Sequence, residues 1–126
     1  MRFYGSAMPL PHIQGAFREK LVVDATQAHR AAGHLSLPTA ALAEPLSVGL
    51  HAIQRAGGVF GKQMLVTGCG AIGSILISGL RRAGAARTVA VDLSDLSDLA
   101  LGVARRMGAD ETINLRTDAA ALEGTR

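Results

Sequence analysis

The sequence predicts an α/β fold in which strands and helices alternate to build a parallel sheet. The uncharged run Gln63–Thr67 leads into the glycine pattern Gly68-x-Gly70-x-x-Gly73 and then into a helical pattern. A second apolar run, Thr88–Val91, ends at Asp92, and a third, Thr112–Leu115, follows another helical pattern. This β-α-β-α-β order, with right-handed crossovers, predicts strands ordered 3-2-1. That is one half of a doubly wound, or Rossmann, sheet.

Composition limits what the chain can be. Its 126 residues suffice for one ordinary domain, and 48% hydrophobic content with only four aromatic residues requires an aliphatic core. Thirteen Lys and Arg against ten Asp and Glu give a net charge of +3. Because the basic residues are scattered, we expect no nucleic-acid partner. The single cysteine, Cys69, excludes an internal disulfide, and its expected role is a small side chain in a turn.

Two stretches bear on location in the cell. The first six residues lack the apolar core of a signal peptide, which predicts a cytoplasmic protein. Residues 63–80 are uncharged and long enough to cross a membrane. Glycines at turn spacing divide that stretch into strand, loop and helix, so we expect no membrane partner.

The part of the chain before the glycine pattern is expected to change from irregular to helical. Residues 1–37 read as irregular, with a short apolar strand at Lys20–Val23. From Pro38 the apolar residues follow helical spacing, and Gly57-Gly58 ends this run. Pro45 lies inside the run, so the sequence predicts a break or a new first turn near Glu44-Pro45.

Each of the two later helical patterns defines an apolar face. The face after the glycine pattern comprises Ile72, Ile75, Leu76, Gly79 and Leu80, and Gly84 marks the expected helix end. The face before Gly108 comprises Leu96, Leu99, Ala100, Val103 and Met107. We expect these faces to cover the sheet.

The glycine pattern has the residues that a dinucleotide pyrophosphate requires. Gly68 permits a tight turn, Gly70 lets backbone approach the phosphates, and Gly73 lets the helix pack closely on the sheet. The helix N-terminus supplies N–H groups and the positive end of a dipole. The expected phosphate-binding residues are Gly68, Cys69, Gly70, Ala71, Ile72 and Gly73. An ordinary strand-turn-helix connection is the structural alternative, and the position between a strand and a helix favours the nucleotide site.

Asp92 follows Gly73 by 19 residues, close to the spacing of the acid that binds the adenosine ribose. Its carboxylate would repel a 2′-phosphate, and Leu93 and Ser94 provide no Arg to bind one. The sequence therefore predicts NAD as cofactor, with Leu93 in the cofactor-binding set. The triplet Leu93-Ser94-Asp95 is repeated at once as Leu96-Ser97-Asp98. We interpret the repeat as a small duplication that lengthens the loop, in which a Ser or Asp can cap the next helix.

Several segments resemble the zinc-containing, medium-chain alcohol and polyol dehydrogenases. They are Met1–Met8, Pro11-His12, Gly15–Phe17, Ala43–Ala52, the glycine pattern, Val91-Asp92 and Met107–Asp110. The likeness extends over nearly the whole chain to Leu115, and the opening octapeptide is its most specific part. The resemblance implies an NAD-dependent oxidoreductase whose partner is a small polyol or sugar acid and whose second cofactor is zinc.

The family's organisation implies that this chain is an internal fragment. A GroES-like catalytic domain precedes the NAD-binding domain in that family. By resemblance, residues 1–45 are a remnant of the catalytic domain and residues 46–126 the first half of the NAD-binding domain. The family's Cys and His zinc ligands and its four structural cysteines are missing from this sequence. We therefore expect an incomplete zinc site, no catalytic residue in the chain and no activity of the chain alone.

The resemblance also implies roles for residues outside the glycine pattern. Glu44 falls where the family places an acid or Cys at or beside the zinc, and Val48 falls beside the nicotinamide. Their structural alternatives are a helix-initiating acid and a buried helix residue. Phe3 and Tyr4 either wall the substrate pocket or pack in the core. The four histidines show no metal-ligand spacing.

Two other classes of function stay open. One is a non-catalytic nucleotide-binding chain, and the other is an S-adenosylmethionine-dependent transferase, against which the Glu44 segment argues. The strand at 63–67 would lack a partner on its outer edge. We therefore expect a homo-oligomer, or self-association through that exposed edge.

Overall fold

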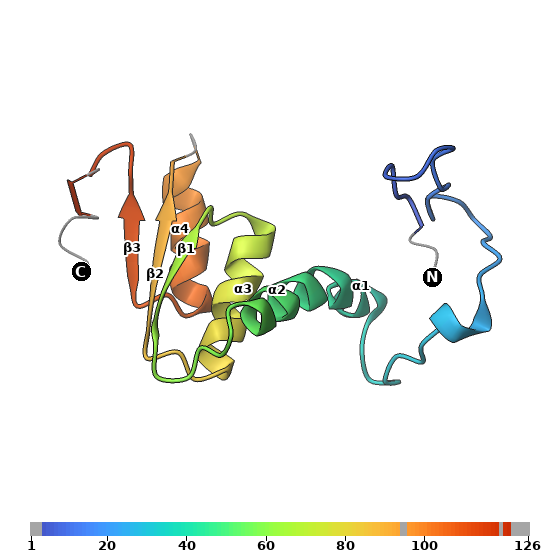
Figure 1. Ribbon diagram of the computed structural model, residues 1–126, viewed down its shortest axis with the longest axis horizontal. Helices are drawn as coiled ribbons and strands as arrows, with labels where there is room; N and C mark the ends of the chain where they lie inside the picture. Colours follow the sequence, from blue (N-terminus) through green and yellow to red (C-terminus); the bar gives the residue numbers. More distant parts are fainter. Residues whose placement is uncertain (1–3, 94–95, 119, 122–126) are drawn as a thin grey trace. The chain divides into compact units, whose positions relative to one another are not determined.

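The computed structural model describes residues 4–93, 96–118 and 120–121, and it divides into two compact units, Met1–Leu35 and Ser36–Arg126. The second unit confirms the predicted α/β class (Figure 1). Its elements are α1 (Leu37–Ala41), α2 (Ala43–Arg55), β1 (Gln63–Thr67), α3 (Ala71–Arg82), β2 (Arg87–Asp92), α4 (Ser97–Met107) and β3 (Glu111–Asn114).

The first unit is built mainly from loops. Its regular element among the described residues is one 3-10 turn, Ala25–Gln27, and backbone hydrogen bonds join Gly5 to Gln14 and Ile13 to Ser6. The predicted strand at Lys20–Val23 is wrong. A short apolar run becomes a strand only when a neighbour pairs with its backbone, and no described segment pairs with this one.

The predicted helix from Pro38 is confirmed, and so is a new first turn near Glu44-Pro45, because α1 ends before Leu42 and α2 begins at Ala43. Ser36 caps α1, with its Oγ accepting from the Thr39 N–H at 3.3 Å. Pro45 lies in the first turn of α2, where a missing N–H removes no helical hydrogen bond. Gly57, with φ of 71°, follows the last turn of α2 as expected.

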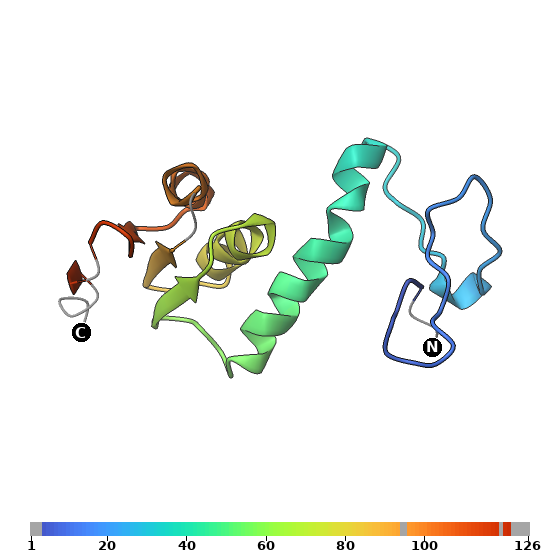
Figure 2. The same ribbon diagram turned by 90° about the horizontal axis from the view of Figure 1, so that it is seen from above.

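The sheet has the predicted strand order. All three strands are parallel, in the order β1-β2-β3, with Leu65 opposite Val89 and Val91 opposite Ile113. Viewed from above, α3 and α4 lie on the same side of the sheet, and α2 packs beside α3 (Figure 2). The strand order and the shared side of α3 and α4 agree with right-handed crossovers.

The main core lies between this side of the sheet and the helices. It is built from Val66 and Ala90 of the strands and from Ile77, Leu80, Leu101 and Ala104 of the helices. The predicted helix faces are only partly right, because Ile77 and Leu101 are buried while Ile72, Leu96 and Leu99 are exposed. In α3 the predicted stripe is shared between two neighbours. Gly79 of the stripe faces Ile53 of α2, whereas Leu80 of the stripe belongs to the core against the sheet, together with Ile77, which was not predicted.

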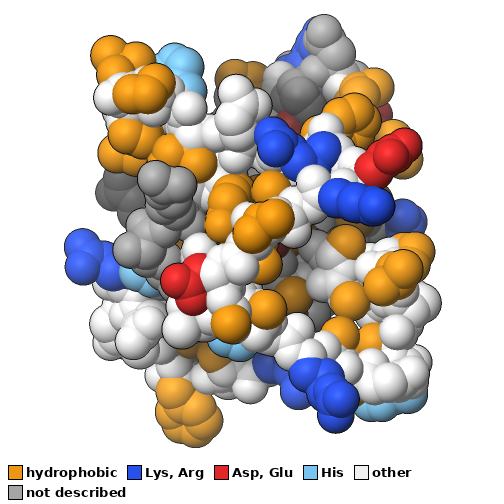
Figure 3. All heavy atoms as spheres, turned by 90° about the vertical axis from the view of Figure 1, so that its right-hand side faces the viewer, with side chains coloured by type: hydrophobic (Ala, Val, Ile, Leu, Met, Phe, Trp, Pro, Cys, Tyr) orange, Lys and Arg blue, Asp and Glu red, His pale blue; other side chains and the backbone are white. Residues whose placement is uncertain are grey.

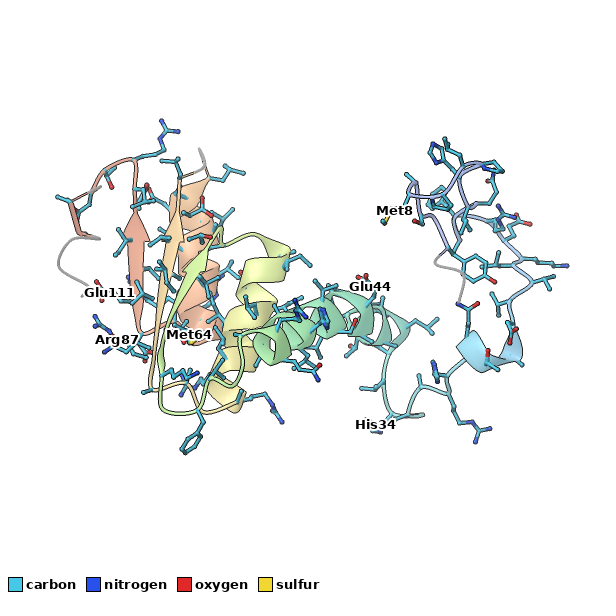
Figure 4. The ribbon with its side chains drawn as sticks, in the orientation of Figure 1. Met8, His34, Glu44, Met64, Arg87 and Glu111 are labelled. Atoms are coloured by element: carbon cyan, nitrogen blue, oxygen red, sulfur yellow. The ribbon has the colours of Figure 1, made fainter. Side chains whose placement is uncertain are left out.

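The opposite side of the sheet carries a smaller cluster of Val89, Val91 and Ile113, packed with Leu115 and Ala121. Leu65 of β1 is 55% exposed. Near the start of β2 and β3, Arg87 and Glu111 form an ion pair, visible in Figure 4. That pair is partly exposed, so it adds little to stability. The structure thus contains the first three strands of a doubly wound sheet, with the helices covering one side of it.

Two observations bear on the predictions about a membrane span and a basic patch. No helix in the described part of the chain is long and apolar enough to cross a bilayer. On the face drawn in Figure 3, Lys and Arg side chains are scattered among hydrophobic ones.

Candidate functional site

The glycine loop between β1 and α3 is held in a conformation that depends on two glycines. Gly68 has φ of 82°, in the left-handed region, and its N–H donates to the Val91 carbonyl at 2.9 Å. A Cβ on Gly73 would lie 2.0 Å from the Gly68 carbonyl oxygen. Any side chain at Gly73 would therefore force the first turn of α3 away from the loop.

Gly70 shows the opposite geometry. Apart from Gly70 and its two chain neighbours, no described residue has an atom within 4 Å of the position that a Cβ on Gly70 would take. Gly70 is the N-cap of α3, and no described side chain caps this helix. The N-terminal N–H groups of a 12-residue helix thus stand beside open space, which is the arrangement that binds phosphate.

Asp92 lies at the loop, as its spacing predicts. It is 7% exposed, and its Oδ2 accepts from the Cys69 N–H at 2.7 Å. Its Oδ1 accepts from the Ser97 hydroxyl at 3.2 Å. The Asp92 backbone carbonyl accepts from the Leu115 N–H at 3.0 Å. The end of β2 is thereby tied to the loop, to α4 and to the segment after β3.

Cys69 is an enclosed side chain of the loop. It is 2% exposed, and its Sγ lies 3.5 Å from the Val91 carbonyl oxygen. Burial, and then the nearby charge of Asp92, raise the pKa of the Cys69 thiol above its ordinary value. A protonated, buried thiol is a poor nucleophile, which favours the expected role as a small side chain in the turn.

A cleft of about 550 Å³ opens beside the loop. Its loop side is lined by Cys69, Gly70, Ala71 and Asp92, and its helical walls by Ser74, Ile75, Leu96, Leu99, Ala100, Val103 and Met107. The apolar face predicted for residues 96–107 therefore forms much of the cleft wall. The residues of α4 that are buried in the core are Leu101 and Ala104. The cleft offers an apolar surface next to the anion-binding end of α3.

The residues assigned by resemblance lie elsewhere. Glu44 and Val48 are both on α2, both are exposed, and neither lines this cleft. Figure 4 shows the Glu44 side chain projecting from α2. Among the residues that the structure describes, no three His, Cys, Asp or Glu side chains gather into a possible metal site. Glu44 by itself does not fit a tetrahedral zinc site, because one carboxylate cannot supply its set of protein ligands.

The remaining predictions for the site have mixed outcomes. Leu93 is exposed directly after Asp92, and Tyr4 lines a separate cleft in the first unit. Phe3, Ser94 and Asp95 lie outside the described residues. Leu96 is the N-cap of α4, so neither of the described repeat residues, Ser97 and Asp98, caps this helix as expected. Sequence reasoning did not predict Ser74 and Ser97 as residues of the site, although Ser74 follows Gly73 and Ser97 follows Leu96. The Ser74 hydroxyl donates to the Cys69 carbonyl at 3.1 Å.

Comparison with known proteins locates this geometry in a family. No protein-family model matches the chain. L-idonate 5-dehydrogenase (NAD(P)(+)) of Escherichia coli K12 is 37% identical over 118 residues, covering 94% of this chain and 34% of that protein. L-idonate 5-dehydrogenase of Vitis vinifera is 33% identical over 123 residues, covering 98% of this chain and 32% of that protein. Sorbitol dehydrogenase of Gallus gallus is 44% identical over 78 residues, covering 62% of this chain and 21% of that protein.

The chain is homologous to the medium-chain polyol dehydrogenases. The crystal structure of the E. coli L-idonate 5-dehydrogenase superposes with a TM-score of 0.88 at 34% identity, covering 99% of this chain and 35% of that one. The resemblance and the fold expected from the sequence are thus confirmed. The chain spans about a third of the length of the two L-idonate dehydrogenases that it matches.

Proposed function

We propose that the chain forms the adenosine-binding half of an NAD-dependent polyol or sugar-acid dehydrogenase. The observation that carries this proposal is the glycine loop, in which Gly73 is closed against the Gly68 carbonyl while Gly70 faces open space. In such a loop the pyrophosphate accepts from the N-terminal N–H groups of α3, and the ribose hydroxyls donate to Asp92. NAD, when bound, accepts a hydride from a substrate CH–OH group.

A preference for NAD over NADP is part of this proposal. The Asp92 carboxylate is held at the loop, and the exposed residue after it is Leu93, which offers no cation to a 2′-phosphate. The name of the E. coli relative records both cofactors, NAD(P)(+), so the selectivity of this chain requires its own measurement.

The substrate proposed for the whole protein is L-idonate, oxidised at carbon 5 to 5-ketogluconate. Two relatives named for L-idonate, each aligned over more than nine-tenths of this chain, support that choice over a neutral polyol. Glu44 beside a zinc ion and Val48 beside the nicotinamide are proposed on resemblance alone. So are a cytoplasmic location and the division into residues 1–45 and 46–126.

The alternative is a chain that binds the nucleotide without catalysing a reaction. The lack of a possible metal site within the described residues favours it for the isolated chain. The two proposals share the nucleotide site and differ only in whether further protein completes the active site.

Isothermal titration of the 126-residue chain with NADH, NADPH and S-adenosylmethionine tests the site. We expect NADH to bind tightest and NADPH more weakly. Asp92→Ala should weaken NADH binding and narrow the difference between the two nucleotides, because the ribose acceptor and the repulsive charge are lost together. Binding of S-adenosylmethionine alone would instead favour the transferase class, and tighter binding of NADPH than NADH would overturn the assigned role of Asp92.

A further inference from the structure

The second copy of the Leu-Ser-Asp repeat joins the start of α4 to two strand ends. The Ser97 hydroxyl donates to Asp92 Oδ1, at the end of β2, over 3.2 Å. Asp98 Oδ1 accepts from Asn114 Nδ2, at the end of β3, over 2.9 Å. Asn114 Oδ1 in turn accepts from the Arg116 N–H at 3.0 Å. The repeat therefore does more than lengthen a loop.

The Asp92 carboxylate is held from two separate elements. Oδ2 accepts from a backbone N–H of the glycine loop, at Cys69, and Oδ1 accepts from a side chain of α4, at Ser97. Ser97 is 2% exposed and Asp92 7% exposed, so both bonds are shielded from water. Hydrogen bonds to an ionised carboxylate are stronger than bonds between neutral groups. Two such bonds restrict rotation of the Asp92 side chain about its own torsions.

Helix capping does not explain this use of Ser97. The N-cap of α4 is Leu96, whose side chain cannot accept a hydrogen bond, and Ser97 is the first residue of the helix. The hydroxyl donates across to β2, to the acid assigned to the ribose. A serine in this place links the position of α4 to the orientation of that acid.

We propose that Ser97 is a positioning residue for nucleotide recognition, holding the Asp92 carboxylate in the orientation that receives the adenosine ribose hydroxyls. This inference rests on the proposed function of Asp92. Ser97 acts through Asp92, so its effect on binding depends on the charge and acceptor capacity of that side chain. Removing the hydroxyl breaks the bond from α4 to the carboxylate and leaves the bond from the Cys69 N–H in place.

A double-mutant cycle on the full 126-residue chain tests the inference. The dissociation constants for NADH and NADPH are measured for the parent chain, Ser97→Ala, Asp92→Asn and the double variant. We expect Ser97→Ala to weaken NADH binding about three- to tenfold, the range that one oriented hydrogen bond gives. NADPH binding should change less, so the ratio of the two constants narrows. In the Asp92→Asn background, Ser97→Ala should change NADH binding by less than about twofold.

Two controls separate positioning from a general structural effect. Ser78→Ala makes the same substitution at a half-buried serine of α3 that lies outside the nucleotide cleft, and it should leave both constants unchanged. Ser97→Cys keeps the branching of the side chain while weakening the donor, and it replaces Ser97→Ala in the cycle if that variant does not fold. Far-ultraviolet circular dichroism and thermal melting establish that each variant is folded.

Each outcome decides one point. If the parent chain binds NADH but Ser97→Ala binds it equally well, the positioning role is overturned while the proposed function stands. The same holds if Ser97→Ala causes an equal loss in both backgrounds, because the two residues then act independently. If the parent chain binds no NADH at all, the proposed function itself fails and Ser97 has no acid to position.

Discussion

At the scale of single residues, the glycine loop contains two glycines whose surroundings are opposite. Gly73 is required inside the protein, because a Cβ there would lie 2.0 Å from a backbone oxygen. Gly70 is surrounded by open space, so its missing Cβ matters only to something that approaches from outside. Since the fold leaves room for a side chain at Gly70, any requirement for glycine there comes from a bound ligand and can be tested by binding.

This contrast can be measured with two substitutions in one loop. Gly70→Val should fold, because the backbone there has φ of −66° and the added Cβ has open space around it. It should weaken NADH binding at least about tenfold by blocking the phosphates. Gly73→Ala should instead lower the free energy of unfolding by about 2–4 kcal/mol through overpacking. Urea unfolding and NADH titration of both variants separate the effects, and a Gly70→Val chain with parental NADH affinity would exclude phosphate binding here.

The Cys69 thiol gives a prediction about pH. Burial and the charge of Asp92 raise the thiol pKa above its ordinary value of 9.0, so the folded chain holds this proton more tightly than the unfolded chain. The resulting stabilisation is complete below the unfolded pKa, and it is lost as pH rises through the folded pKa. Native alkylation by iodoacetamide should therefore reach half its maximal rate at a higher pH than a free cysteine. Cys69→Ala should remove the corresponding fall in stability in alkaline solution, and half-maximal alkylation below pH 9.0 would contradict the assignment.

At the scale of helices and strands, the sequence pattern predicts which elements exist better than it predicts what they contact. The βαβαβ order, the helix ends at Gly57 and Gly84 and the approach of Asp92 to the loop follow from local chemistry. The burial of Ile77 does not, because α3 packs against both the sheet and α2, and periodicity cannot say which neighbour each side meets. Lys20–Val23 fails for a related reason, since a strand requires a partner that propensity does not provide. The role of Ser97 could not be predicted for the same reason, because its hydroxyl contacts a residue of another element, Asp92 of β2.

The contact between α2 and α3 gives a prediction at this scale. Gly49 is the buried residue of α2, and a Cβ there would lie 3.5 Å from Leu76 Cα, an ordinary van der Waals distance. Gly49→Ala should therefore stabilise the chain by about 0.5–1 kcal/mol, because alanine favours a helix interior over glycine. Gly49→Leu should destabilise it, since a longer side chain cannot fit between the two helices. Chemical denaturation of both variants provides the test, and a destabilised Gly49→Ala would show that the helices pack more tightly than this distance implies.

At the scale of the whole molecule, the second unit is a sheet with one covered side and two edges. The strand order places β1 and β3 at the edges, and no further described strand pairs with β1. The second side of the sheet is covered only by a small cluster around β2 and β3, leaving Leu65 of β1 55% exposed. An apolar strand with unpaired N–H and C=O groups is a template for pairing with another chain.

We therefore expect the 126-residue chain to form dimers or larger assemblies at micromolar concentration, measured by light scattering. Leu65→Lys should shift the chain toward monomer, because a charge on the exposed side of an edge strand opposes pairing. Leu42→Lys is the matched control: Leu42 is also 55% exposed but lies between α1 and α2, away from the strand edge. It should leave the assembly unchanged. A strictly monomeric parent chain with a sharp melting transition would mean that half of a doubly wound sheet is stable without a partner for β1. Equal effects of Leu65→Lys and Leu42→Lys would assign the association to general surface hydrophobicity.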